Sequence, residues 1–563
     1  MSDSLQSRLY RRQEEAPERP ALAFVDGRGR FRWWPVAEAY ERAAVRGAGL
    51  VDRGCAPGQR CVIVLPSDEE CATVLLGALL AGVVPLLVAP PVLQPSRHSA
   101  FLVNLEHTLD RVRPRVVVAP RGLELAEGSA WARTGERVEP RALAAAGREL
   151  ERPHPAAADT AALQLTSGTT GAPRVCRWTH AAVLAALDGM ERAMALGPDD
   201  VCFNWTPLYH DMGLVNNFLL CLTAGVPLAM LAPTDFVVRP SRWLRGLADT
   251  GATVSWSPNF GFALAAERIP DAELEGVRLD PVRALWNAAE RIHVETMLGF
   301  HARFAQLGLA FEALKTNFGC AENVGGATFS DLDGPFRWEE VDAALLHDEE
   351  RAFPATPAAR GGPVARIASA GRPVQGMRVV IAGSDDHPLP DGVVGRILLD
   401  TPSRMAEYLG DPAATGEAFA DGLLSTGDLG YTRDGELYWV GRARERMTVR
   451  GKKIDPSEFE RMLLGIAGLR PGCFVAFGVA DARLGTERPV VVSEVIDPGG
   501  RPLPEIAADI HEAANAELGL ALDDVVLVGR GTLAKTSSGK RRHRHFREVY
   551  ENGGLASLYS TRG

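Results

Sequence analysis

Residues 165–174 read Leu-Thr-Ser-Gly-Thr-Thr-Gly-Ala-Pro-Arg and form the most informative stretch of the chain. Small residues leave backbone N–H groups free to face an anion, and the hydroxyl groups add further donors. This composition predicts a loop that holds a polyphosphate. The loop lacks the closing Gly-Lys-Ser/Thr of a Walker motif, so it indicates another class of nucleotide site. Taken alone, the same residues are also typical of a surface turn.

The composition of the chain limits the function classes that apply. Its 563 residues exceed what one hydrophobic core organises, so we expect at least two domains. The net charge of −10 comes without a long basic stripe and argues against a nucleic-acid-binding protein. The eight cysteines are scattered and show no metal-ligand spacing, which predicts reduced thiols in a cytoplasmic protein.

One apolar stretch is long enough to span a bilayer. Residues 71–93 carry no charge, but three prolines interrupt the second half. We expect instead a helix over about 68–80, a stop at Ala81-Gly82, and a buried strand over 83–88. The sequence therefore predicts no membrane span.

Helix and strand patterns alternate along the chain and predict an α/β fold. Residues 75–91 and 217–233 each read as an apolar helix, an Ala-Gly stop and an apolar strand, so we expect two stacked α/β subdomains, each with its own sheet. Short strands with Asp-Gly turns in residues 379–399 and 437–449 predict a small β-rich subdomain. Residues 331–370 break the pattern and indicate an inserted surface element, with a helical flap and a mobile loop.

A boundary follows near residues 441–446. Beyond it we expect a compact α+β domain of ordinary domain size. Its predicted elements are helices over 455–464 and 504–518 and strands over 473–479 and 490–495. The chain is therefore divided into a large N-terminal domain, residues 1–441, and a small C-terminal domain, residues 442–563.

Six short motifs occur in a recognisable order. They are residues 165–174, Pro-Leu-Tyr-His-Asp-Met-Gly at 207–213, Asn-Phe-Gly-Cys-Ala-Glu at 317–322, Ser-Thr-Gly-Asp at 425–428, Gly-Arg-Ala-Arg at 441–444, and Lys-Thr-Ser-Ser-Gly-Lys at 535–540. From about residue 9 to residue 547 the chain resembles the adenylate-forming superfamily. The resemblance implies that a carboxylate attacks the α-phosphorus of ATP and expels pyrophosphate, with Mg²⁺ as a cofactor. Because two anions must meet, such a reaction needs positive charge and positioning.

The resemblance implies a role for several residues. Lys540, on a mobile C-terminal domain, would reach both the carboxylate and the α-phosphate, and Glu322 would hold Mg²⁺ through hard oxygen ligands. His210 would lie beside the reacting carboxylate. Asp428 would accept the ribose hydroxyls, and Phe318 would stack on adenine.

Further residues are implied as nucleotide contacts, as the hinge and as the acyl pocket. The nucleotide contacts are Thr166, Ser167, Gly168, Thr169, Thr170, Gly171, Arg174, Ala288, Ala289, Glu290, Asn317, Gly319, Cys320, Ala321 and Arg442. Arg444 occupies the hinge position, about which the small domain would rotate between adenylation and transfer. The acyl pocket would draw on Trp205, His210, Trp256, Phe260, Phe262, Leu264 and Trp286. So many bulky aromatics favour a medium-chain, branched or functionalised acid as much as a long fatty acid.

The chain departs from the common superfamily pattern at three places. Arg174 stands where lysine is common, and Ala321 stands where threonine is common. Asn287 is followed by Ala-Ala-Glu-Arg where Gly-Ala-Glu-Pro is usual, which could narrow or reshape the acyl tunnel.

Three features resemble the fatty acyl-AMP ligases in particular: residues 207–213, Ser-Pro-Asn-Phe-Gly-Phe at 257–262, and the insertion at 331–370. They imply transfer of the acyl group to the phosphopantetheine thiol of an acyl carrier protein. The arginines of residues 541–547 would offer a cationic surface to an acidic carrier. Three alternatives stay open: an acyl-CoA ligase, an amino-acid adenylation enzyme whose Asp211 holds the substrate ammonium, and, remotely, a non-catalytic adenylate-binding protein.

Overall fold

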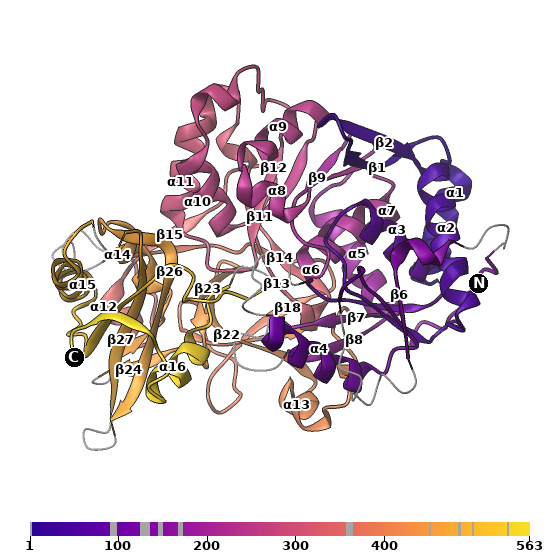
Figure 1. Cartoon of the computed structure of the whole chain (residues 1–563). Coiled ribbons are helices and arrows are strands. Elements are labelled where there is room, and N and C mark those ends of the chain that lie inside the picture. The colour runs from indigo at the N-terminus through magenta and orange to yellow at the C-terminus, as the bar shows by residue number, and fades with distance from the viewer. Residues whose placement is uncertain are drawn as a thin grey trace.

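The structure is a computed structural model. It describes residues 3–90, 98–123, 135–144, 150–166, 173–355, 364–449, 452–481, 486–497, 500–536 and 540–562. Figure 1 shows the C-terminal segment, in orange and yellow, packed at one side of a larger body, with the N-terminus at the opposite side of that body. The fold is the mixed α/β fold that the sequence predicts.

The first large sheet has seven strands in the order β20-β8-β7-β4-β3-β5-β6. Their bounds are β3 Arg60–Ile63, β4 Val84–Leu87, β5 Val116–Val118, β6 Glu136–Val138, β7 Thr160–Leu165, β8 Val175–Thr179 and β20 Glu407–Tyr408. The strands from β7 to β6 pair in parallel, and β8 and β20 add antiparallel pairs at one edge. The inner strands are apolar and buried, as strands covered on both faces require.

The second large sheet has nine strands in the order β17-β14-β13-β12-β11-β9-β10-β1-β2. Their bounds are β1 Pro20–Val25, β2 Phe31–Pro35, β9 Cys202–Asn204, β10 Leu228–Met230, β11 Val254–Pro258, β12 Ala284–Ala288, β13 Leu314–Cys320, β14 Gly325–Phe329 and β17 Arg372–Pro373. The two similar sequence stretches end in β4 and β10, which lie in different sheets. The prediction of two α/β subdomains, each with its own sheet, is therefore confirmed.

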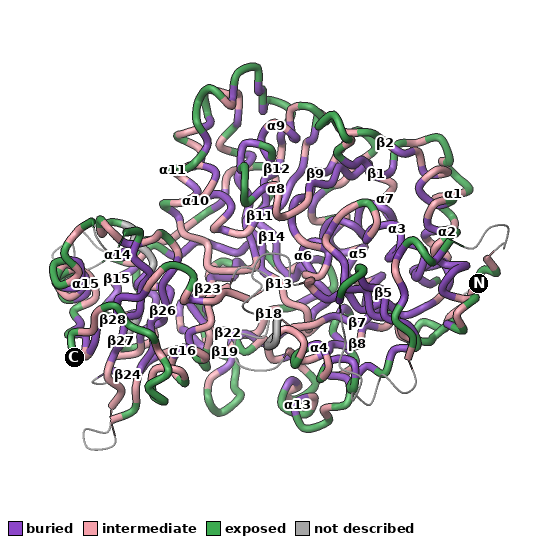
Figure 2. The backbone as a smooth tube through the Cα atoms, in the orientation of Figure 1, coloured by how far each residue is buried: buried purple, intermediate pink, exposed green. Residues whose placement is uncertain are grey.

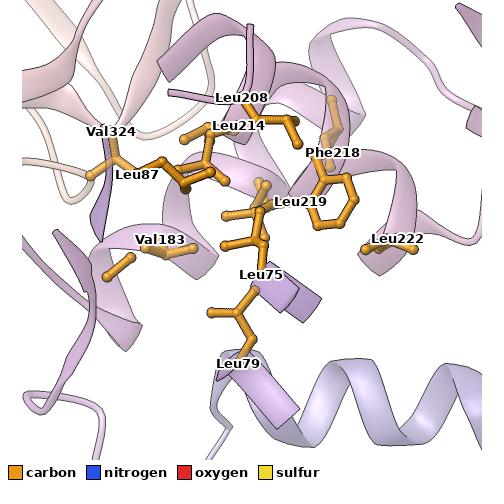
Figure 3. Close-up of a cluster of buried hydrophobic side chains, with 14 of the residues drawn as sticks. Leu75, Leu79, Leu87, Val183, Leu208, Leu214, Phe218, Leu219, Leu222 and Val324 are labelled. Atoms are coloured by element: carbon orange, nitrogen blue, oxygen red, sulfur yellow. The ribbon is translucent and has the colours of Figure 1, made fainter. Parts of the chain in front are cut away.

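Helices cover these sheets and fill the space between them. They are α1 Leu5–Glu15, α2 Val36–Asp52, α3 Glu69–Leu80, α4 His98–Val112, α5 His180–Ala193, α6 Asp211–Gly213, the π-helical segment η4 Leu214–Leu219, α7 Leu220–Ala224, α8 Pro233–Val238, α9 Ser241–Thr250, α10 Asn259–Arg268 and α11 Val294–Phe304. Short 3₁₀ turns occur at η3 Pro140–Leu143, η5 Asp271–Leu274, η6 Ala305–Leu307, η7 Phe311–Ala313 and η8 Ala321–Asn323. Leucines of α3 meet Leu214, Phe218 and Leu219 of η4 in the core (Figure 3).

The apolar stretch that begins at residue 71 forms core rather than a bilayer span. Asp68 caps α3 by accepting the Cys71 N–H at 3.0 Å, and the helix ends at Leu80, followed by the C-cap Ala81 and by Gly82 at φ +71°. Strand β4 follows, as predicted. Among the described residues, no helix is both long enough and apolar enough to cross a membrane. All eight cysteines are unpaired, and seven of them are buried.

The β-rich subdomain is also present. Its elements are β18 Arg378–Ala382, β19 Gly395–Asp400, β21 Phe419–Ala420, β22 Leu423–Arg433 and β23 Glu436–Arg442, with helix α13 Pro412–Glu417. Strands β22 and β23 form a hairpin across Asp434 and Gly435, which both have positive φ. This is the two-residue Asp-Gly turn that the sequence indicates.

The insertion differs from the expected helical flap. Strand β15 Trp338–Asp342 pairs antiparallel with β16 Val364–Ala368, and only the short helix α12 Ala343–Asp348 follows β15. The predicted helical flap is wrong for residues 338–342, which form strand β15. This strand pairs with β16, which is distant in sequence, and it buries Val341 against Tyr431 and Tyr438. Part of the predicted loop, residues 356–363, lies outside the described residues.

The C-terminal segment carries a four-stranded sheet in the order β26-β27-β28-β29. Its elements are β24 Met447–Val449, β25 Lys452–Ile454, α14 Glu458–Leu464, β26 Leu469–Asp481, β27 Thr486–Val495, α15 Leu503–Leu518, β28 Asp524–Val528, α16 His543–Glu551 and β29 Ser557–Ser560. Helix α14 begins three residues later than expected. Two separate apolar clusters lie on the faces of this sheet, and Figure 2 shows its strands buried behind an exposed rim.

Candidate active site

A cavity of about 540 Å³ lies where both large sheets, the β22–β23 hairpin and the C-terminal segment meet. Its wall contains residues from all six sequence motifs. They include Thr166 and Arg174, His210 and Asp211, Asn317 to Glu322, Ser425 to Asp428, Arg442 and Arg444, and Lys540. Motifs hundreds of residues apart in the sequence thus share one site.

Strands β7 and β8 close the base of the predicted phosphate loop. The Thr166 N–H donates to the Arg174 carbonyl at 2.9 Å, and the Arg174 N–H donates to Thr166 Oγ1 at 3.1 Å. The Arg174 guanidinium lies over the ring of Tyr408, 5.1 Å from its centroid. The predicted contacts Ser167, Gly168, Thr169, Thr170 and Gly171 lie outside the described residues. Both ends of the loop reach the cavity wall, where a polyphosphate would need them.

Glu322 and Tyr408 form a hydrogen-bonded pair at the same wall. The Tyr408 hydroxyl donates to Glu322 Oε1 at 2.7 Å, and burial and the Glu322 charge raise the pKa of the phenol well above its usual range. The Trp178 N–H donates to the Ala321 carbonyl at 2.7 Å and fixes the turn that carries Glu322. Sequence reasoning missed Tyr408, because it lies 86 residues from Glu322 and outside every motif.

The carboxylate of Glu322 offers the hard oxygen ligands that Mg²⁺ prefers. Tyr408 engages only one carboxylate oxygen, which leaves the second hard oxygen for an ion. Within the described parts of the chain, no group of three or more His, Cys, Asp or Glu side chains could hold a metal. Magnesium commonly takes one or two protein carboxylates and completes its shell with substrate phosphates and water, so the residues present fit that ion.

Asp428 lies buried on β22, opposite Arg442 on β23 in the hairpin register. Arg442 Nε is 3.3 Å from Asp428 Oδ1. Burial raises the pKa of Asp428, and the Arg442 charge offsets part of that effect. A buried carboxylate at a cavity wall is an acceptor-only group, which suits two hydroxyl donors such as those of a ribose.

The predicted adenine wall comes from two neighbouring strands. Phe318 lies at the end of β13 with 8% exposure, among Asn317, Gly319, Cys320 and Ala321. Ala288, Ala289 and Glu290 line the cavity from the end of β12. Glu290 Oε1 also accepts the Phe260 N–H at 2.6 Å, so it caps the N-terminal turn of α10.

The unusual residue Arg291 connects the two parts of the chain. Its guanidinium donates to Ser457 Oγ at 2.8 Å. The neighbouring Asp455 accepts the Arg442 N–H at 3.2 Å, and burial raises the pKa of this carboxyl. Arginine in place of proline here therefore gives the C-terminal segment a direct contact with the nucleotide side of the cavity.

Lys540 lies in the cavity with His210 and Asp211. Mutual hydrogen bonds between Thr536 and Lys540 close its loop, of which residues 537–539 are outside the described residues. Burial and the nearby Arg442 lower the pKa of the Lys540 ammonium, although Asp211 and Asp428 oppose that shift.

Asp211 is paired with its neighbour in the chain. His210 Nδ1 lies 2.6 Å from Asp211 Oδ1. Burial acts to raise the pKa of Asp211, but His210 and then Lys540 lower it below its usual range. The carboxylate is therefore engaged by groups of this chain, which disfavours the alternative in which it holds a substrate ammonium.

The predicted acyl-pocket aromatics pack into the protein itself. Of the seven residues, His210 lines the cavity, whereas Trp205, Trp256, Phe260, Phe262, Leu264 and Trp286 do not. Trp205 and Phe262 lie with Trp243 in the cluster on the outer face of the nine-stranded sheet, and Trp256 and Trp286 lie on its inner face. The sequence could not assign these faces. The cavity is also lined by Met212, Asn216, Gly325 and Ala370, which sequence reasoning missed.

The predicted hinge residue Arg444 and the arginines predicted to bind a carrier protein interact with other groups of this chain. Arg444, 60% exposed in its side chain, lies 3.4 Å from Glu417. The Arg541 guanidinium lies over the Phe474 ring and lines the cavity. Arg544 and Arg547 pair with Glu548 and Glu551 of the same helix. Because these charges are neutralised locally, the arginine cluster offers less free positive surface than its sequence suggests.

His543, which lines the cavity, is expected to make the folded protein less stable in acid. Burial and Arg541 lower the pKa of His543 to about 4, and its Nδ1 lies 3.1 Å from the Ala476 nitrogen and 3.0 Å from the Ala476 carbonyl oxygen. Since the folded-state pKa lies below the unfolded value near 6.5, the unfolded chain binds more protons as the pH falls between them. We expect His543 to cost about 2 kcal/mol of stability between pH 7 and pH 5.

Urea unfolding at the two pH values measures this effect. The variant His543→Gln should lose less stability in acid than the natural chain. The variant His387→Gln, at an exposed turn, is the matched control and should behave like the natural chain. Equal losses for all three proteins would contradict the assignment.

The sequence profile of the AMP-binding enzymes matches residues 9–409, more than half of the chain. The chain belongs to the AMP-binding enzyme family. It is thus an adenylate-forming ligase, a class that uses ATP, and the predicted family and enzyme class are confirmed.

Individual relatives differ in the acceptor that their names imply. The medium-chain-fatty-acid–[acyl-carrier-protein] ligase JamA of Moorena producens is 28% identical over 517 residues, covering 88% of this chain and 86% of JamA. A protein of Caulobacter vibrioides, assigned by its name to the acyl-CoA synthetases, is 29% identical over 538 residues, covering 92% and 90%. A solved structure from work on the fatty acyl-adenylate ligases of E. coli and L. pneumophila has a TM-score of 0.89 at 26% identity, covering 98% and 99%.

Proposed function

We propose that this enzyme joins a carboxylic acid to the AMP moiety of ATP and then transfers the acyl group to the phosphopantetheine thiol of an acyl carrier protein. One observation carries the proposal: Lys540 of the C-terminal segment shares a cavity with Asp428 and Glu322 of the N-terminal body. A cation, a hydroxyl acceptor and a hard oxygen ligand are what this reaction needs around a nucleotide.

The chemistry proceeds in two displacements. In the first, a carboxylate oxygen of the acid bonds to the α-phosphorus of ATP, the α–β bridging oxygen bond breaks, and pyrophosphate leaves. Lys540 stabilises the charge that builds on the α-phosphate and holds the incoming carboxylate, while Asp428 orients the ribose. Glu322 would hold Mg²⁺, which neutralises charge on the phosphates when bound. In the second, the thiolate sulfur bonds to the acyl carbon, and AMP leaves.

The second displacement requires the thiol of the carrier protein in the site in place of Lys540. We propose that residues 442–563 rotate about Arg444 to exchange Lys540 for the incoming thiol. The separate apolar clusters of this segment support its movement as one body. Polar contacts join it to the N-terminal body, such as Arg291 with Ser457 and Glu350 with Arg446 and Lys453. Polar interfaces of this kind are typical of domains that move relative to one another.

Mass spectrometry of the purified enzyme tests the proposed function. The enzyme is given ATP, Mg²⁺ and a pool of carboxylic and amino acids, with CoA or a phosphopantetheine-bearing carrier protein offered separately. We expect acyl-AMP and then an acylated carrier, and little acyl-CoA. A carrier protein without phosphopantetheine is the control.

Each alternative has its own outcome. Acyl-CoA as the main thioester would assign the enzyme to the CoA ligases, which the relative from Caulobacter vibrioides makes a serious second candidate. An aminoacyl-AMP would assign it to amino-acid adenylation. Absence of pyrophosphate release with every acid would indicate a non-catalytic adenylate-binding protein.

A further inference from the structure

Arg291 forms a hydrogen bond between the two parts of the chain. It lies on the N-terminal body, three residues after the end of β12, and its guanidinium donates to Ser457 Oγ of the C-terminal segment at 2.8 Å. Both residues line the cavity, and Ser457 is buried. A hydrogen bond from a charged donor is stronger than one between neutral groups. The C-terminal segment therefore loses a favourable contact whenever Ser457 moves away from Arg291.

The backbone around Arg291 is constrained on the N-terminal side. Strand β12 ends at Ala288, and Ala289 follows with φ +72°, in the left-handed region. Glu290 Oε1 accepts the Phe260 N–H at 2.6 Å, which ties this turn to α10. The Arg291 guanidinium is thus presented from a fixed turn, so its bond restrains the C-terminal segment.

Ser457 and Lys540 belong to one packed unit of the C-terminal segment. Phe459 lies two residues beyond Ser457, in the same apolar cluster as Phe474 of β26. The Arg541 guanidinium lies over the Phe474 ring, 4.7 Å from its centroid. Because Arg541 directly follows Lys540, a bond that holds Ser457 in place also holds Lys540 in the cavity.

The contact of Arg291 with Ser457 continues to β23, just before the predicted hinge. Ser457 donates its hydroxyl and its N–H to Asp455 Oδ1, and Asp455 Oδ2 accepts the Arg442 N–H at 3.2 Å. A Cβ at Gly441 would come within 2.0 Å of Asp455 Oδ2, so the close approach of this carboxylate requires glycine there. Burial raises the pKa of the Asp455 carboxyl, and the charge of Arg291 opposes that rise. Arg291 thus favours the ionised carboxylate that accepts the Arg442 N–H.

We infer, on the basis of the proposed function, that Arg291 is a positioning residue that holds the C-terminal segment in the pose for adenylation. In this pose Lys540 shares the cavity with Asp428. Rotation about Arg444 to admit the thiol has to break the bond between Arg291 and Ser457. An interaction made in only one of two poses shifts their populations toward that pose. Arg291 therefore slows acyl transfer relative to adenylation.

The two half-reactions, measured separately, test this inference. Arg291→Met keeps the apolar stem of the side chain but removes the donors. The single-turnover rate constant for transfer from preformed acyl-AMP, divided by that for adenylation, should rise about tenfold, as expected for the loss of one hydrogen bond from a charged group. Ser457→Ala removes the same bond from the other side and should raise this ratio as much. The double variant should show no further rise, because both changes remove one interaction.

Arg278→Met is the matched control. Arg278 lies 2.8 Å from Asp280 of its own segment, so its loss should leave the ratio as in the natural enzyme. Arg291→Lys keeps a cation that can donate, and it should bring the ratio back toward the natural value. An unchanged ratio in both Arg291→Met and Ser457→Ala would overturn the inference, and so would fully additive changes in the double variant.

Hydrogen exchange at the Arg442 amide gives a readout that needs no turnover. Arg442 precedes Arg444 in the chain and Asp455 follows it, so rotation about Arg444 separates this N–H from its acceptor. In Arg291→Met the amide should exchange about tenfold faster. Equal exchange in the variant and the natural enzyme would overturn the inference. Absence of acyl-AMP from every acid would instead reject the proposed function, while exchange at Arg442 would still decide whether Arg291 holds the C-terminal segment.

Discussion

Replacing Lys540 with methionine is expected to lower the rate of acyl-AMP formation about 10²- to 10³-fold. Methionine keeps the length and the apolar stem of the side chain but removes the cation that faces the carboxylate and the α-phosphate. Asp211 and Asp428 would then lose a neighbouring positive charge and keep only their pairing with His210 and Arg442. Pyrophosphate release under single-turnover conditions measures the loss.

The two half-reactions separate the role of Lys540 from a general loss of structure. With preformed acyl-AMP supplied, Lys540→Met should acylate the carrier protein nearly as fast as the natural enzyme. Lys540→Arg keeps the charge but replaces a compact ammonium by a planar fork, so we expect it to restore little adenylation. Equal losses in both half-reactions would contradict the assignment.

The pH dependence of the first half-reaction has a definite sign. The ammonium is the active form of Lys540, and burial and Arg442 lower its pKa. Adenylation should therefore decline as the pH rises through a value below that of a free lysine. The transfer half-reaction, which does not use this ammonium, should lack the decline.

The second large effect is expected at the ribose. Asp428→Asn should raise the KM for ATP about 30- to 100-fold, because two hydrogen bonds to a charged acceptor are exchanged for weaker neutral ones worth about 2–3 kcal/mol less. The amide also places an N–H₂ group against hydroxyl donors and leaves Arg442 without the carboxylate 3.3 Å away. Steady-state kinetics at varied ATP concentrations measure the change.

Deoxynucleotides provide the matched control for Asp428. The natural enzyme should lose affinity for 2′-deoxy-ATP and 3′-deoxy-ATP relative to ATP. Asp428→Asn should show little further loss, because the two changes remove the same interaction and are not additive. Fully additive losses would place Asp428 away from the ribose.

Much of this architecture follows from local patterns that any fold must obey. The helix of residues 69–80 and strand β4 were predictable because a capping Asp, an apolar run and an Ala-Gly stop act within a few residues. The Asp-Gly hairpin of β22 and β23 was predictable for the same reason. The six motifs were recognisable because each is a short continuous segment whose residue types suit a nucleotide.

The prediction from sequence failed where a strand or a side chain contacts a segment that is distant in the chain. Strand β15 was misjudged because its partner β16 lies more than twenty residues away, and a strand's stability comes from that partner. Tyr408 was missed because its contact with Glu322 joins distant segments. The aromatic residues predicted for the acyl pocket are divided between the two faces of the nine-stranded sheet, and the sequence does not show which of them lie on the same face.

The sequence by itself therefore determined the fold class, the local elements and the chemical inventory of the site, since each depends on neighbouring residues. Only the tertiary structure decided how these groups meet. It brought Lys540 close to Asp211, joined Arg291 to Ser457 of the C-terminal segment, and paired Tyr408 with Glu322. These outcomes depend on burial and on distances between remote segments, and both arise only when the chain is packed.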